Sequence, residues 1–274
     1  MHSIADESLS LCQGGGGASC AACCGLYNLA DPSFEGLSAI LRRRADAFSD
    51  IAREAGAIAR YTARIESLER QERPNEAFPH CPFMAFTTPE HDRVGCLLHP
   101  MAPGNNGTDY RDLSLYGSMA CRLYICPAHQ VLEARHKRLL TASAPDWYLY
   151  GLLIPEAALL KSFFAHVEAE LGAALDPEAA LACPACLESM AHLYDLKPLW
   201  PYRSRGASAG GGYVFSEAPD PKPIDYAALG VAPSPFDPIF RALCSEFASE
   251  QDLRVAENAI RSLILDLVRA LSRA

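Results

Sequence analysis

The sequence has little that would mark a nucleic-acid-binding or membrane-spanning protein. It contains 24 Lys and Arg against 33 Asp and Glu, and its compact basic run is LRRR at 41–44. Binding to phosphate backbones requires basic patches, so we expect no nucleic-acid partner and place this run on the solvated face of a helix. There is no run of eighteen or more apolar residues, so we expect no transmembrane helix and no membrane partner.

The N-terminal residues lack both the basic segment and the apolar segment of a secretory signal peptide. We therefore expect a cytoplasmic protein, in a compartment where disulfides are rare. The chain nevertheless has eleven cysteines. In a reducing compartment these are expected to bind metal or to carry redox chemistry.

Common catalytic motifs are missing as well. No Gly-Lys-Ser/Thr follows a glycine-rich loop, and there is no Ser-His-Asp elbow and no convincing pair of carboxylates. No glycine-rich strand-to-helix turn of the Rossmann kind is present. The sequence thus leaves open whether the protein is an enzyme, and it leaves open a protein partner.

Strand signals are few, and YVF and VGCLL are the short candidates. Apolar residues repeat at helical spacing over 34–65, which predicts a long helix or a helical hairpin. Asp31 and Pro32 are suited to its N-cap and first turn, Gly56 to a break, and Pro74 to its end.

The second half has repeated helix signals. Helices are predicted after Pro127, before a stop at Gly172, from Asp176-Pro177, from Asp237-Pro238 and after Ser249. We expect a mainly α fold in which an irregular, cysteine-rich, metal-stapled region packs on a helical bundle. The expected division places the cysteine-rich metal-binding region at 1–142 and a helical region with a CPAC motif at 143–274.

The first half of the chain carries most of the thiols. Its eight cysteines are Cys12, Cys20, Cys23, Cys24, Cys81, Cys96, Cys121 and Cys126. Thiolates bind zinc or iron–sulfur clusters in fours, and the CxxC of Cys20 and Cys23 lets two sulfurs reach one metal. The side chain of Cys24 diverges from that of its neighbour, so Cys24 either binds a second centre or replaces Cys23 as the ligand.

Two motifs place a cysteine directly before a proline. In CPAH and CPAC, Cys126 and Cys183 are predicted at helix N-caps, where the helix dipole stabilises a thiolate. His129 and Cys186 then turn back toward the same helix end, which makes both pairs candidate ligand pairs. A thioredoxin-like role for CPAC is the weaker interpretation, because no βαβ pattern surrounds it.

Other polar residues near the cysteines are expected to play supporting roles. His99 and His129 flank ligand cysteines, and we expect them to form hydrogen bonds rather than to bind metal. Asp109, Arg111, Asp112 and Tyr116 either cap turns, which is the favoured interpretation, or line a pocket over the site. Cys244 is expected to be a small apolar residue of a helix.

The order of the cysteine motifs resembles that of a known family. CAACC, CPFM, GCLLHP and CRLYIC are similar to the motifs of the YkgJ-like family of cysteine-rich zinc- or iron-chelating domains, over roughly residues 12–130. The resemblance implies a metal site, with Cys20, Cys23, Cys24, Cys81, Cys96, Cys121 and Cys126 at family positions and Cys12 as a further match. The expanded segment between His99 and Arg111 departs from the family pattern.

The resemblance leaves the metal and its role open. A distant similarity to flagellin lysine-N-methylases implies an iron–sulfur cluster and methyl transfer. A cluster can collect ligands from distant segments, whereas structural zinc usually takes two well-separated pairs. The sequence therefore favours an iron–sulfur cluster with a redox or cluster-dependent role, over a structural zinc module or a methyltransferase-like enzyme.

Overall fold

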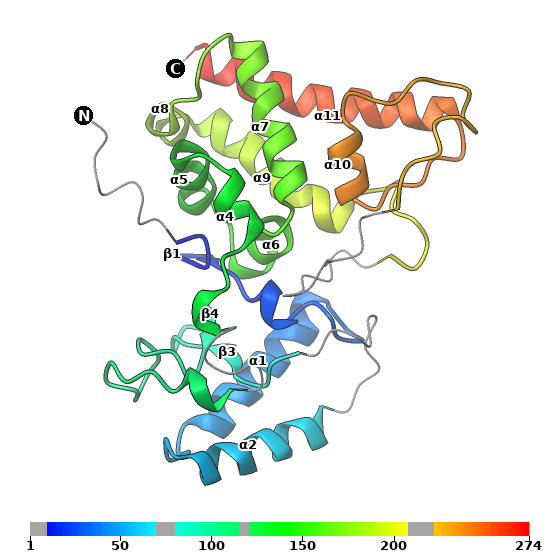
Figure 1. Cartoon of the computed structure of the whole chain (residues 1–274). Helices are drawn as coiled ribbons and strands as arrows, with labels where there is room; N and C mark the ends of the chain where they lie inside the picture. Colours follow the sequence, from blue (N-terminus) through cyan, green and yellow to red (C-terminus); the bar gives the residue numbers. More distant parts are fainter. Residues whose placement is uncertain (1–9, 70–79, 115–120, 208–221, 274) are drawn as a thin grey trace.

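The computed structural model describes residues 10–69, 80–114, 121–207 and 222–273, and the protein is mainly helical, as the sequence predicted. Figure 1 shows a helical bundle beside a smaller part that contains α1, α2, β3 and β4. The helices are α1 (Phe34–Phe48), α2 (Ala55–Leu68), α4 (Pro127–Val131), α5 (Ala134–Ala142), α6 (Trp147–Leu153), α7 (Ala157–Leu171), α8 (Pro177–Ala182), α9 (Pro184–Leu199), α10 (Asp237–Ala242) and α11 (Glu250–Leu271). Short 3-10 helices occur at η1 (Ala22–Cys24) and η2 (Arg111–Leu113).

The strands form two small antiparallel hairpins. One joins β1 (Gln13–Gly15) to β2 (Ala18–Ser19), and the other joins β3 (Met84–Phe86) to β4 (Val94–Cys96). The VGCLL candidate is therefore a strand. YVF lies outside the described residues.

The segment with the apolar repeat over residues 34–65 forms a helical hairpin. Its helices α1 and α2 are separated at residues 49–54, just before Gly56. The first helix begins two residues later than predicted, because the Ser33 side chain accepts the backbone N–H of Gly36 and acts as N-cap. Asp31 instead accepts the backbone N–H of Ser33.

The prediction for LRRR was wrong at Arg44, which is 1% exposed. Its guanidinium donates to both carboxylate oxygens of Glu69, and to the carbonyls of Cys81 and Met84 at 3.0 and 3.1 Å. A buried arginine is stable only when its donors are satisfied, and the acceptors come from segments distant in sequence. Helical periodicity alone could not identify them.

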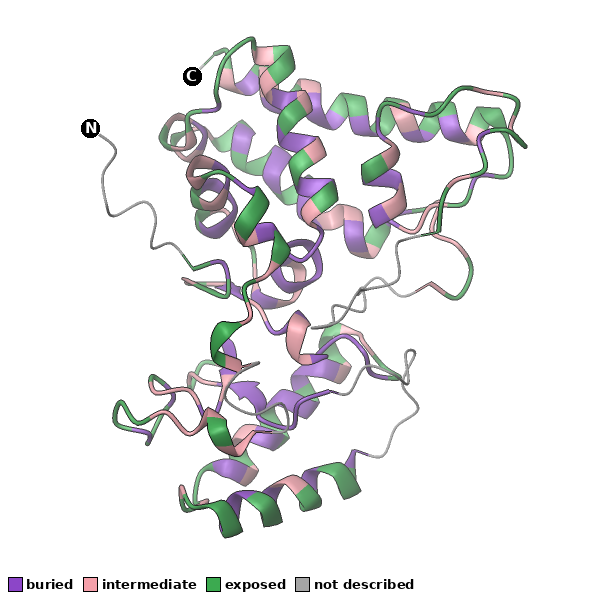
Figure 2. Cartoon of the chain, viewed as in Figure 1, coloured by how far each residue is buried: buried purple, intermediate pink, exposed green. Residues whose placement is uncertain are grey.

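The helices of the second half form the bundle. Helix α11 packs on both α7 and α9, α10 packs on α7, and α6 packs on α9. Gly172 ends α7 with a φ of 67°, and Asp176 caps α8 through the N–H groups of Glu178 and Ala179. These ends confirm the predicted helix signals. In Figure 2 the inward faces of the bundle helices are buried while the outer side of α2 is exposed.

The described residues form two hydrophobic cores. The N-terminal core is built mainly from residues 21–98, and the C-terminal core from residues 128–270 together with Leu11 and Ala18. Helix α6 belongs to both, because Trp147 and Leu152 pack in the N-terminal core while Tyr150 and Leu153 pack in the C-terminal core. The expected boundary at residue 142 stays a prediction, and the two cores interleave along the chain.

Among the described residues, no single helix has the length and apolar character needed to cross a membrane. Helices α6 and α7 reach that composition only together, and they are bent by 87° relative to each other.

Candidate metal centre

The fold sorts the eight cysteines of the first half into two groups of four. The first group is Cys12, Cys20, Cys23 and Cys126, and the second group is Cys24, Cys81, Cys96 and Cys121. Within each group the thiols lie close enough to interact electrostatically. The groups meet at the neighbouring residues Cys23 and Cys24.

The first hairpin brings two members of the first group together. Gln13 lies opposite Ser19, and beyond this pair the N–H of Cys20 donates to the carbonyl of Cys12 at 3.1 Å. Residues that face each other across an antiparallel pair project on the same side. The hairpin therefore directs the Cys12 and Cys20 side chains to one place.

The other two members arrive from a 3-10 turn and a helix. Cys23 lies in η1, which ends at Gly25 with a φ of 82°, a conformation suited to glycine. Cys126 is the N-cap of α4, with Pro127 at the first helical position, as the sequence predicted. Cys126 packs against the C-terminal core, and Cys20 packs against both cores.

All six pairs in the first group interact electrostatically. Burial of the thiol, with contributions from Cys23 and Cys126, raises the pKa of Cys12 to about 12, although the residue as a whole is exposed. Burial also raises the pKa of Cys20, and Cys23, Cys12 and Cys126 add to it. The pKa of Cys126 is raised by burial and by Cys23. All four thiols, after burial itself, also contribute to a pKa of about 12 for Tyr124.

The second group assembles against the N-terminal core. The N–H of Cys81 donates to the carbonyl of Cys24 at 2.8 Å. Cys96 ends β4 opposite Met84, whose N–H donates to the carbonyl of Cys81 at 3.4 Å. The Cys121 sulfur lies 3.1 Å from the Ser114 hydroxyl, and the backbone carbonyl of Cys121 accepts a hydrogen bond from Arg111 Nη1 at 3.1 Å.

In the second group, electrostatic interactions link Cys81, Cys96 and Cys121 to one another, and they link Cys24 to Cys81 and Cys96. Burial raises the pKa of Cys81, and Cys96 and Cys121 raise it further. Burial, with Cys121 contributing, raises the pKa of Cys96 to about 11. The pKa of Cys24 is raised by its hydrogen bond with Cys23, by burial, and by Cys81 and Cys96.

The sulfurs of Cys23 and Cys24 are 4.0 Å apart. Their hydrogen bond lowers the pKa of Cys23 and raises that of Cys24. These directions make Cys23 the more acidic thiol of the pair.

Charge around the two groups differs. Arg111 lies near Cys96 and Cys121. Its interaction with Asp109 raises the pKa of Arg111, and the charges of the two thiols raise it further. Arg44 reaches the second group through the Cys81 carbonyl. The first group is bordered by the hydroxyl-bearing rings of Tyr124 and Tyr150, both influenced by its thiols.

The donor set consists of thiols, which suit zinc or iron–sulfur clusters. A zinc ion with 2.3 Å bonds requires its four sulfurs to be roughly 3.8 Å apart. In the described part of the chain, no set of three or more His, Cys, Asp or Glu side chains is gathered closely enough to hold one ion.

The neighbouring polar residues take hydrogen-bonding roles. The Nδ1 atom of His99 accepts the N–H of Met101 at 3.1 Å, and burial and Arg111 lower the His99 pKa. Asp109 accepts both the backbone and the side chain of Arg111, which is the expected turn capping. Tyr116 lies outside the described residues.

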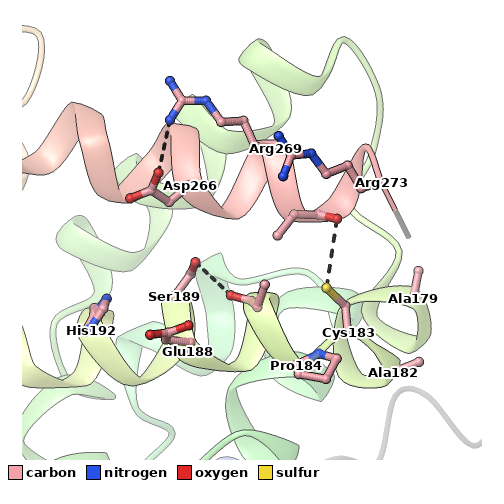
Figure 3. A pocket seen from close by; sticks show the side chains of 12 residues that line it. Ala179, Ala182, Cys183, Pro184, Glu188, Ser189, His192, Asp266, Arg269 and Arg273 are labelled. Atoms are coloured by element: carbon pink, nitrogen blue, oxygen red, sulfur yellow. Dashed lines mark hydrogen bonds and ion pairs between the residues drawn. The ribbon is translucent and has the colours of Figure 1, made fainter.

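Cys183 and Cys186 belong to neither group. Cys183 caps α9 and borders a cavity of about 780 Å³ between α9 and α11 (Figure 3). A hydrogen bond with Cys186 lowers the pKa of Cys183, whereas burial raises that of Cys186 to about 12. Cys244 also lies apart, in the turn after α10 with a φ of 54° rather than within a helix.

Comparison with known proteins returned no match: no family model, curated protein or solved structure is similar to the chain. The family resemblance of the cysteine motifs stays a prediction. The functional argument therefore depends on the two cysteine groups themselves.

Proposed function

We propose that the protein binds an iron–sulfur cluster cofactor through the eight cysteines of the two groups and that it has a redox role. The observation that carries this proposal is the convergence of cysteines from five separate segments into two sets made of thiols alone. Thiols kept merely as small apolar residues would be spread through the cores.

The number of ligands supports a redox role over chemistry on a bound substrate. An iron–sulfur cluster bound by four thiolates has no protein-free position where a substrate could attach. A catalytic metal keeps one position open. When bound, such a cluster supplies one-electron transfer, and the chain's own contribution is to hold the thiolates and exclude water.

The surroundings of the thiols support the same proposal. Burial raises the pKa of most of these thiols, so they remain protonated at neutral pH until a cation replaces the proton. Arg111 and Arg44 offset negative charge at the second group. Structural zinc bound by the same thiols is the second candidate, and the four-thiol donor sets are the observation that favours it.

The test is to purify the full chain anaerobically and to measure iron, sulfide and zinc per chain. We expect iron and sulfide in equal amounts and a brown protein whose visible absorption bleaches with dithionite. A colourless protein with stoichiometric zinc would show that the zinc module is the correct candidate. A folded protein that takes up neither metal would refute both.

Single substitutions extend this test to the ligands. Cys81→Ser and Cys121→Ser should each lose metal, because both residues lie in the second group. Cys244→Ser is the matched control and should keep the wild-type metal content. Wild-type metal content in both Cys81→Ser and Cys121→Ser would contradict the assigned ligand set.

A further inference from the structure

We infer that the eight cysteines hold two separate centres joined by the Cys23–Cys24 peptide bond, with Cys23 a ligand of one centre and Cys24 a ligand of the other. This inference rests on the proposed function and deepens it. It assigns the first group to one centre and the second group to another.

Ligand number is the first argument. A structural zinc ion or a [4Fe–4S] cluster takes four protein thiolates. The chain brings eight together, and they divide four and four. One centre would leave half of these buried thiols without a function.

The attachment of each group to the fold is the second argument, and it is independent of charge. In the first group, Cys126 packs against the C-terminal core and Cys20 packs against both cores. In the second group, Cys81 belongs to the N-terminal core, and Cys24 and Cys96 pack against it. The first centre therefore lies at the junction of the two cores and the second lies against the N-terminal core, and η1 carries the chain from one to the other.

The adjacent pair is the third argument. Successive side chains diverge, so Cys23 and Cys24 reach different partners although their sulfurs are only 4.0 Å apart. Cys24 is tied to the second group through the backbone bond from Cys81. Cys23 interacts with Cys12, Cys20 and Cys126. Ligands that belong to different clusters yet are close in sequence are known from two-cluster ferredoxins.

The two centres have different surroundings. Cluster potential depends on net charge, hydrogen bonds and solvent exposure. Arg111 and Arg44 lie at the second group, whereas tyrosines border the first group. Each arginine is paired with a carboxylate, Arg44 with Glu69 and Arg111 with Asp109. The two centres therefore differ in their hydrogen-bond partners, and we expect two different reduction potentials.

The experiment compares the full-length chain with Cys126→Ser, Cys121→Ser and the double variant, each reconstituted anaerobically with iron and sulfide. Cys244→Ser is again the matched control. With [4Fe–4S] clusters we expect about eight irons per wild-type chain, half that number in each single variant, and none in the double variant. Far-UV circular dichroism establishes that each variant is folded.

A measurement on the wild type alone keeps the inference testable if a variant does not fold. Two adjacent reduced clusters should give a spin-coupled electron paramagnetic resonance spectrum, and stepwise reduction should show two transitions. After loss of Cys126, one of the two transitions should remain.

The outcomes separate this inference from the proposed function. Four irons per wild-type chain, or complete loss of metal in either folded single variant, would overturn the two-centre inference and leave an iron–sulfur protein. Two zinc ions per chain, one lost in each single variant, would support two centres and overturn iron–sulfur. A metal-free wild type would overturn both.

Discussion

The buried ion pair of Arg44 and Glu69 holds Arg44 against the backbone carbonyl of Cys81 in the second group. Loss of this ion pair should lower the free energy of unfolding by a measurable amount. Glu69 is 1% exposed and accepts from Arg44, while Arg44 also donates to the carbonyl of Cys81. The substitution to make is Glu69→Gln, which keeps the shape of the side chain and removes its charge. Arg44 would then be a buried cation without its counterion.

The size of the effect follows from the ionisation of Glu69. Burial raises the pKa of Glu69, but hydrogen bonds from His80, Arg44 and Arg43 outweigh it and lower the pKa from 4.5 to about 2. That difference corresponds to roughly 3 kcal/mol of stability at neutral pH. Removal of one partner of a buried pair typically costs about 3–5 kcal/mol, so we expect a loss of roughly 3 kcal/mol.

The assay is urea unfolding of the metal-free protein followed by the fluorescence of Trp147. The chain has two tryptophans, and Trp200 lies in the C-terminal core, so a Trp200→Phe background isolates the N-terminal core. With an m-value of roughly 2 kcal/mol/M, the midpoint of Glu69→Gln should fall by about 1.5 M. Glu250→Gln is the control, because its pair with Arg254 is exposed and contributes at most about 0.5 kcal/mol.

The pH dependence gives a second readout. Because the folded-state pKa of Glu69 lies below its ordinary value, the stabilisation is complete above about pH 5 and is lost as the pH falls toward 2. Glu69→Gln should lack this part of the acid destabilisation. A variant within 1 kcal/mol of wild type at pH 7, or one with unchanged acid sensitivity, would refute the reasoning.

Two further predictions concern other parts of the chain. Iodoacetamide should modify Cys183 before Cys186 in the folded protein, because the pKa of Cys183 is lowered and Cys186 is buried. Peptide mass spectrometry measures the order of modification. Faster modification of Cys186 would contradict the prediction. Gly151→Ala should destabilise the protein by about 1–3 kcal/mol, since an added Cβ would meet the Tyr27 hydroxyl at 2.1 Å. Gly56→Ala is the matched control, because its Cβ has room, and it should stabilise α2 by up to about 1 kcal/mol. Equal effects of the two substitutions on thermal unfolding would contradict the prediction and would show that α6 can move away from Tyr27.

Local signals in the sequence predicted the mainly α class and many of its helix ends. Ser249 caps α11, Asp176 caps α8, and Cys126 and Cys183 precede N-terminal prolines, as predicted. Such ends are decided by a few neighbouring residues, so a sequence contains them. The sequence prediction did not include helix α6, although Asp146 caps it through the N–H of Leu149.

The sequence by itself also determined the chemistry of the candidate site, because eight cysteines in one half of the chain define a thiol donor set. It left open the role of Cys24 and assigned Arg44 to solvent. Only the tertiary structure identifies the neighbours of both residues. The neighbours of Cys24 arrive from residues 81 and 96, and the acceptors of Arg44 arrive from residues 69, 81 and 84. Contacts between segments so far apart depend on how two cores pack, which no local pattern contains.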